Sequence, residues 1–126
     1  MRILLVEPDT VLADIYSKAC TRAGHIVTHV RGAQQAITAS DDNRPDVVVL
    51  ELQLAAHSGS AFLYEFRTYE DWLKIPIVLH TLVPPDTLRV YERSFAELGV
   101  VAQLYKPQTS LRQLLAVITA SAIVRV

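Results

Sequence analysis

Several apolar runs in this 126-residue chain end in side chains that could take part in phosphate chemistry. Glu7 and Asp9 follow the first run, Glu51 the third, Thr81 the fourth and Lys106 the fifth. Carboxylates can hold a hard divalent cation, and a carboxylate can also accept a phosphoryl group. A hydroxyl and an ammonium can bind phosphoryl oxygens. Gathered in one cleft, these residues could therefore handle a phosphoryl group.

The elements that would position these residues are predicted from hydrophobic patterning. Val47–Leu50 is apolar at every position, which is typical of a strand whose two faces are both covered by helices. Five strands are predicted, at Arg2–Val6, His25–Val30, Val47–Leu50, Pro76–His80 and Val100–Tyr105. Glu51 then lies at the carboxyl edge of the sheet, where ligands bind in open α/β folds.

Apolar residues at helical spacing predict five helices that alternate with the strands. They are 11–23, Ala33–Ala39, Ala61–Trp72, Leu88–Leu98 and a last helix that Ser110 opens, and Thr81 to Asp86 is predicted as a loop. Asp9 or Thr10 can cap the first helix, and Ser58 or Ser60 the third. The pattern predicts a doubly wound five-stranded parallel sheet, a (βα)5 fold of the α/β class with right-handed crossovers. The flavodoxin-like strand order 2-1-3-4-5 would bring Glu7 beside Glu51.

Length and composition exclude several classes of protein. The chain suits one domain over residues 1–126, without an output domain after the last helix. The net charge is −1 with interspersed signs, so we expect no nucleic-acid interface. No apolar run approaches the length of a membrane span. Cys20 falls in an apolar helical pattern, so we expect its side chain to be buried. It is the only cysteine and cannot form a disulfide within the chain, so we expect a reducing, cytoplasmic location.

Four marks in order give the chain a resemblance to a known family. They are the acidic turn after the first strand, the stretch Val49–Leu54 with Ser58-Gly59, the stretch Pro76–Thr81, and Lys106-Pro107. With them, nearly the whole chain resembles the receiver domain of bacterial two-component response regulators, which has a chemotaxis-regulator-like (CheY-like) fold. The resemblance implies a role in phosphorelay signal transduction through protein partners.

The resemblance also implies roles for individual residues. The acid at position 51 would accept a phosphoryl group from a histidine kinase, and Thr81 and Lys106 would bind that group. Magnesium would be held by the second acid of the first turn, by the acceptor and by the backbone carbonyl of Gln53. The face that carries Tyr91, Gln103 and Tyr105 would contact partners.

The chain departs from the family pattern at three positions. Glu51 stands in place of the acceptor aspartate, Pro8 in place of the second acid with Asp9 one position late, and Gln103 in place of an aromatic switch residue. The extra methylene of Glu51 adds roughly 1.5 Å of reach. A displacement of about 1 Å can reduce the rate of an in-line reaction on the order of 100-fold. Magnesium also tolerates misplaced ligands poorly.

We therefore expect an atypical receiver, a pseudo-receiver that is not phosphorylated in the usual way and is not an enzyme beyond residual self-phosphorylation or dephosphorylation. No cofactor is expected, and Mg²⁺ binding at Glu7, Asp9 and the Gln53 carbonyl should be weakened. Glu51 could instead approach Lys106 directly and imitate part of an aspartyl phosphate. Asp9 is expected to act as a helix cap rather than as a metal ligand.

Alternatives remain at this point. Glu51 could be phosphorylated with Mg²⁺, the crevice could sense a small ligand, or His57 in the third loop could accept the phosphoryl group. His80 is expected to be a structural histidine. The partner could be a histidine kinase, another regulator, an output protein or a second copy of the chain.

Overall fold

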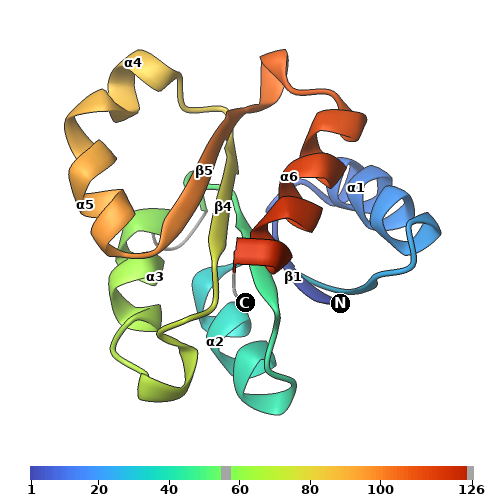
Figure 1. The fold of residues 1–126 in the computed structure, drawn as a ribbon, viewed down its shortest axis with the longest axis horizontal. Coiled ribbons are helices and arrows are strands. Elements are labelled where there is room, and N and C mark those ends of the chain that lie inside the picture. Colours follow the sequence, from blue (N-terminus) through green and yellow to red (C-terminus); the bar gives the residue numbers. More distant parts are fainter. Residues whose placement is uncertain (55–57, 125–126) are drawn as a thin grey trace.

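The computed structural model describes residues 1–54 and 58–124, with side chains described as far as Ser121. It contains one five-stranded parallel sheet in the order β2-β1-β3-β4-β5, which confirms the predicted order (Figure 1). The strands are β1 (Arg2–Val6), β2 (Ile26–Val30), β3 (Val47–Leu50), β4 (Ile77–Thr81) and β5 (Val100–Tyr105).

Helices cover both faces of this sheet and complete a three-layer sandwich (Figure 1). The α-helices are α1 (Thr10–Arg22), α2 (Ala33–Asp42), α3 (Gly59–Phe66), α4 (Pro85–Leu88), α5 (Glu92–Glu97) and α6 (Leu111–Val124). Three short 3-10 helices are η1 (Glu70–Trp72), η2 (Arg89–Tyr91) and η3 (Lys106–Gln108). Helices α1 and α6 pack on one face, and α2, α3, α4 and α5 pack on the other.

Side-chain alternation divides the core between the two faces of the sheet. In β3, Val47 and Val49 join the core under α1 and α6, whereas Val48 and Leu50 join the core under α2 and α3. All four valine and leucine side chains are buried, as the uninterrupted apolar run predicts. Cys20 of α1 is also buried, in the core under α1 and α6.

The caps of two helices match the sequence. The Asp9 carboxylate accepts the backbone N–H groups of Val11 and Leu12 at the start of α1. The Ser58 hydroxyl accepts the N–H of Ala61 at the start of α3. Both side chains satisfy N–H groups that have no partner within the first helical turn.

Three predicted helices and one loop are wrong in extent. The helix predicted at Ala33–Ala39 continues to Asp42. The helix predicted at Ala61–Trp72 ends at Phe66, because the Arg67 side chain binds backbone carbonyls of Trp72 and Ile75 and so holds the chain as it folds back through η1. Tertiary contacts of this kind leave no periodic signal in the sequence.

The helix predicted at Leu88–Leu98 is divided into α4, η2 and α5, and it begins earlier than predicted. Pro85 occupies the first position of α4, where its missing N–H needs no partner. Only Leu88 and Phe95 are buried in this region, too few to hold one continuous helix against the core. Thr81, predicted as the start of a loop, is the last residue of β4 and is buried.

Candidate functional site

The site forms where four strands of the sheet end. Glu7, Glu51 and Lys106 directly follow β1, β3 and β5, and Thr81 is the last residue of β4. The pairing of β1 with β3 brings the two glutamates together, and the pairing of Thr81 with Tyr105 brings Lys106 to the same edge. The sheet topology alone therefore assembles the predicted constellation.

The Glu51 carboxylate accepts hydrogen bonds from four donors. Its Oε1 atom lies 2.8 Å from Lys106 Nζ and 3.0 Å from the backbone nitrogen of Leu82. Its Oε2 atom accepts the Thr81 hydroxyl and, at 3.1 Å, the backbone N–H of Gln53. A carboxylate offers about four lone-pair positions. All of them are satisfied within the chain.

Lys106 lies between two acids. Its Nζ atom is 2.5 Å from Glu7 Oε1 and 2.8 Å from Glu51 Oε1. The lysine side chain is 5% exposed and each glutamate side chain is 2% exposed, so these charges have little access to water. With one cation and two anions, the buried cluster carries a net charge of −1 when all three groups are ionised.

The pKa values of this pair shift in the directions that keep it charged. Burial raises the pKa of Glu51, but hydrogen bonds from Lys106, Thr81 and Gln53 outweigh that effect and lower it. Burial lowers the pKa of Lys106, but the hydrogen bonds and charges of Glu51 and Glu7 outweigh it and raise that pKa. The ion pair is therefore stable in its charged form at neutral pH.

The acidic turn after β1 is committed to local contacts. The second oxygen of Glu7 accepts the backbone N–H of Asp9 at 3.0 Å, and the Asp9 side chain is exposed and caps α1. Arg31 donates to the Pro8 carbonyl at 3.1 Å. Across residues 1–54 and 58–124, no three His, Cys, Asp or Glu side chains are arranged so that they could hold a metal ion.

His80 is buried beside this site, on the face of the sheet that α1 and α6 cover. Its ring meets the ring of Tyr16 edge-on, with centroids 4.8 Å apart. Its Nδ1 atom is the one buried side-chain nitrogen or oxygen in the described part of the chain that lacks a hydrogen-bond partner. Burial, helped by the positive charge of Lys106 and opposed by Glu51, lowers the pKa of His80 to about 4.

Protonation of His80 should make the fold sensitive to mild acid. Its pKa is about 4 in the folded chain, against the usual 6.5 of a histidine in water, so the unfolded chain binds a proton first as the pH falls. Stability is therefore fully present above pH 6.5 and declines as the pH falls towards 4. We expect His80 to account for a loss of about 2 kcal/mol in the free energy of unfolding between pH 7 and pH 5.

Urea titrations at several pH values, on the chain and on His80→Leu, measure this effect. His80→Leu should lack that part of the pH dependence, while contributions from other histidines remain in both proteins. An equal decline in both proteins between pH 7 and pH 5 would contradict the assignment to His80.

Sequence reasoning missed two participants at the site. The backbone N–H of Leu82 donates to Glu51, and a backbone donor cannot be recognised from the type of its residue. Tyr16 has the helical spacing of a core residue, and only the fold places it against His80 close enough for Glu7, Glu51 and Lys106 to influence its pKa, which burial raises. His57, the alternative acceptor, lies outside the described residues.

The predicted partner face is only partly contiguous. Gln103 and Tyr105 of β5 line the same groove, next to Pro85 of α4. Tyr91 belongs to η2, where it is 52% exposed and packs against Phe95 with ring centroids 5.8 Å apart.

A family model for the response regulator receiver domain matches residues 3–119. The chain belongs to this family. Receiver domains act in two-component signalling, and the predicted family and fold are thereby confirmed. Within the described residues, no helix of this receiver domain is long and apolar enough to cross a membrane.

One curated relative shares sequence with this receiver domain. The probable transcriptional regulatory protein TcrX of Mycobacterium tuberculosis (strain ATCC 25618 / H37Rv) is 35% identical over 79 residues. The match covers 63% of this chain and 33% of the relative, so it spans about one third of that protein's length.

Solved structures show the same fold at low sequence identity. A sensor protein from Polaromonas sp. JS666 has a TM-score of 0.90 at 19% identity, covering 99% of this chain and 98% of that one. The chemotaxis protein CheY4 of Vibrio cholerae has a TM-score of 0.83 at 19% identity, covering 95% and 97%. The receiver domain of a histidine kinase from Syntrophus aciditrophicus has 0.82 at 22%, covering 97% and 89%.

Proposed function

We propose that this receiver domain acts in two-component signal transduction as a protein-binding module whose phosphorylation site is filled by its own Glu51. In this proposal the chain is not phosphorylated in the usual way. Its conformation is fixed by internal contacts, and its output is the binding of a protein partner such as a histidine kinase, another regulator or an output protein.

The bonding of the Glu51 carboxylate carries the proposal. The family resemblance assigns the Thr81 hydroxyl and the Lys106 ammonium to a phosphoryl group. Here both groups bind the Glu51 carboxylate instead, together with the Leu82 N–H. A phosphoryl donor would have to break these charge-assisted bonds before it met either a free acceptor oxygen or free donors.

The acids of the site do not fit a magnesium ion as they are arranged. Both oxygens of Glu7 accept hydrogen bonds, from Lys106 and from the Asp9 backbone, and the Glu51 oxygens are likewise occupied. Pro8 offers no side-chain oxygen, and Asp9 caps α1. An ion would have to displace Lys106, so we propose that magnesium binding is weak and plays no part in the function.

The same reasoning favours a role without catalysis, since both oxygens of Glu7 and both oxygens of Glu51 already accept hydrogen bonds within the chain. The cytoplasmic location expected from the sequence stays a prediction.

Intact mass spectrometry after incubation with acetyl phosphate tests the proposal. The chain should gain no phosphoryl group with or without magnesium, under conditions that label a control receiver. One added phosphoryl group that needs magnesium, is released by hydroxylamine and is lost in Glu51→Gln would show that Glu51 is a working acceptor. That result would overturn the proposal in favour of a conventional receiver.

A further inference from the structure

Strand β5 forms an open edge of the sheet. It pairs with β4 on one side and is the last strand of the order, so its other side has no strand neighbour in the described part of the chain. Edge strands in natural proteins are commonly protected by charges, by proline or by a cover. The six residues of β5, Val100–Tyr105, include neither a charge nor a proline.

The ladder with β4 indicates which backbone groups face outward. Ile77 donates to the Gly99 carbonyl, and after an irregularity at Ile77/Val78 the register pairs Leu79 with Gln103 and Thr81 with Tyr105. In a parallel ladder the residue opposite a bonded residue turns its own N–H and C=O away. Gln103 and Tyr105 therefore direct their backbone groups to the open edge. The Thr109 hydroxyl donates to the Tyr105 carbonyl at 2.7 Å. The N–H and C=O of Gln103 and the N–H of Tyr105 remain for a partner.

This edge lies at the bottom of a groove. On one side a hollow of about 440 Å³ is bounded by β5, Pro85 and the α6 residues Gln113, Ala116 and Val117. A second hollow of about 380 Å³ continues along β5 past Pro85 and Gln103 to the α5 residues Glu92 and Ala96. Together they follow the strand over its length.

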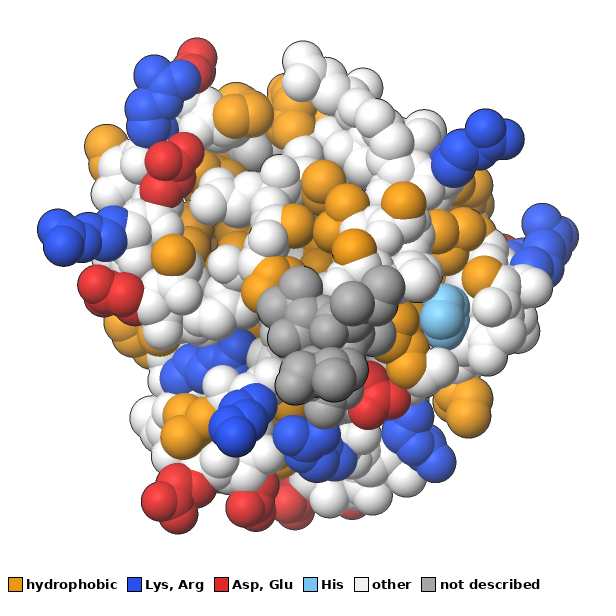
Figure 2. All heavy atoms as spheres, viewed as in Figure 1, with side chains coloured by type: hydrophobic (Ala, Val, Ile, Leu, Met, Phe, Trp, Pro, Cys, Tyr) orange, Lys and Arg blue, Asp and Glu red, His pale blue; other side chains and the backbone are white. Residues whose placement is uncertain are grey.

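The groove carries little charge. The residues that bound the larger hollow are uncharged, with amides and a hydroxyl from Gln103, Gln108, Gln113 and Thr109, and Glu92 is the one charged residue of the smaller hollow. Figure 2 shows this face, with uncharged and apolar surface over β5 and with Lys, Arg, Asp and Glu side chains towards the rim. An anionic ligand would therefore lose its hydration here without finding an opposite charge, and a cationic ligand would find only Glu92.

We propose that this groove binds an extended, uncharged segment of a partner protein, which adds to β5 as a sixth strand. This inference rests on the proposed role as a protein-binding module and names how the partner is held. The backbone of the segment would pair with Gln103 and Tyr105, and its side chains would lie alternately towards the α5 side and the α6 side of the groove.

The shape of the groove favours a single strand over other occupants. A helix satisfies its own backbone groups and is about 10 Å wide, so it would not pair with the edge. A second copy of this chain would present a β5 edge that is equally recessed between its own helices. Pairing of two such edges would first have to bring together the helices that flank both grooves, which disfavours a second copy as the occupant.

Peptide display on the immobilised chain tests the proposal. Panning a library of random linear peptides should enrich uncharged sequences with β-branched or aromatic residues at alternate positions. A selected peptide should lose about tenfold or more in affinity when alternate backbone amides are N-methylated, because more than one hydrogen bond to the edge is then lost.

Two variants at position 103 distinguish the contribution of the backbone N–H from that of the side chain. Gln103→Pro removes the outward N–H and should weaken peptide binding about fivefold, because proline is tolerated on an edge strand but cannot donate. Gln103→Thr keeps the N–H and should bind within about threefold of the unmodified chain. Circular dichroism verifies the fold, and if Gln103→Pro does not fold, the N-methylated peptides still decide the question.

Several outcomes would overturn the proposal. They are a library without enrichment, selected peptides that are charged or helical, N-methylated peptides that bind equally well, and a concentration-dependent dimer of the chain that Gln103→Pro abolishes. Labelling of Glu51 by acetyl phosphate would instead overturn the proposed function while leaving the peptide result to be judged separately.

Discussion

Lys106→Met is expected to lower the free energy of unfolding at pH 7 by about 3 to 5 kcal/mol, because it leaves two buried carboxylates without a cation. Glu7 and Glu51 each lose a charge-assisted bond to the same ammonium. Water cannot replace these bonds, since both side chains are 2% exposed. Urea unfolding followed by circular dichroism measures the loss.

An exposed lysine provides the matched control. Lys18 pairs with Asp14 at 2.9 Å on the surface of α1, where the two side chains are 64% and 61% exposed. Lys18→Met should change stability by less than about 1 kcal/mol, because an exposed pair is solvated and screened. Equal effects of the two substitutions would contradict the account of a buried, tightly coupled cluster.

Acid should partly restore the Lys106→Met variant. Without the ammonium, the two neighbouring carboxylates repel each other and take up a proton more readily than in the parent chain. The deficit relative to the parent chain should therefore shrink as the pH falls from 7 towards 5. The parent pair behaves in the opposite way, because the lowered pKa of Glu51 means that its stabilisation is present above pH 4.5 and is lost below it.

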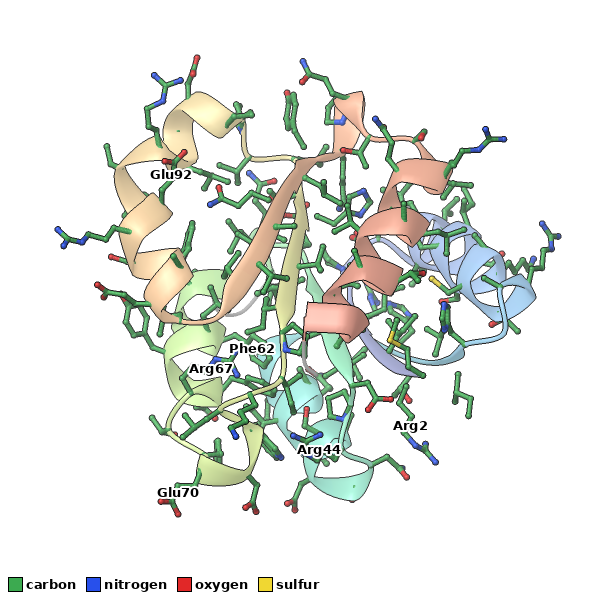
Figure 3. All side chains as sticks on the ribbon, viewed as in Figure 1. Arg2, Arg44, Phe62, Arg67, Glu70 and Glu92 are labelled. Carbon is green, nitrogen blue, oxygen red and sulfur yellow. The ribbon has the colours of Figure 1, made fainter. Side chains whose placement is uncertain are left out.

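The second large effect is expected at Arg67, which lies at the end of α3 (Figure 3). Its guanidinium donates to three backbone carbonyls, those of Leu98 at 2.6 Å, Trp72 at 2.5 Å and Ile75 at 2.5 Å. Burial lowers its pKa. The side chain thus ties the end of α3 to the segment before β4 and to the turn before β5.

Arg67→Met should lower the free energy of unfolding by about 3 kcal/mol, since three carbonyls lose their donor and water reaches them incompletely. Arg67→Lys should recover only part of this, because an ammonium cannot reproduce the three-way geometry of a guanidinium. Arg93→Met serves as the control, because Arg93 is 95% exposed on α5. An Arg67→Lys variant as stable as the parent would show that charge alone matters there.

Gly99 is part of the same arrangement. Its φ angle is +81°, and a Cβ atom at this position would collide with the guanidinium of Arg67. The turn before β5 therefore accepts glycine for two independent reasons, backbone conformation and space.

Much of the fold could be predicted from the sequence because its signals are local and consistent. The apolar run of β3, the cap at Asp9 and the alternation of strands and helices are each visible in a few adjacent residues. Once parallel strands are predicted, the carboxyl ends of β1 and β3 converge, and residue order alone then places Glu7, Glu51 and Lys106 at one edge of the sheet.

What could not be predicted depends on contacts between distant segments. The end of α3 at Phe66 is stabilised by Arg67 reaching carbonyls up to 31 residues away. The division into α4 and α5 follows from how few residues there meet the core. The Leu82 N–H on Glu51 and the orphaned His80 nitrogen depend on the sheet register rather than on residue type.

A signalling state held by Glu51 would differ from a phosphorylated one in its lifetime as well as in its chemistry. An acyl phosphate is lost by hydrolysis. The Glu51 carboxylate is a covalent part of its own side chain and therefore lasts as long as the polypeptide. If Glu51 occupies the place of the phosphoryl group, the state begins when the chain folds and ends when it unfolds or is degraded. The cell would then control this signal through the amount of the protein and the supply of its partner, so the quantity to follow is abundance rather than modification.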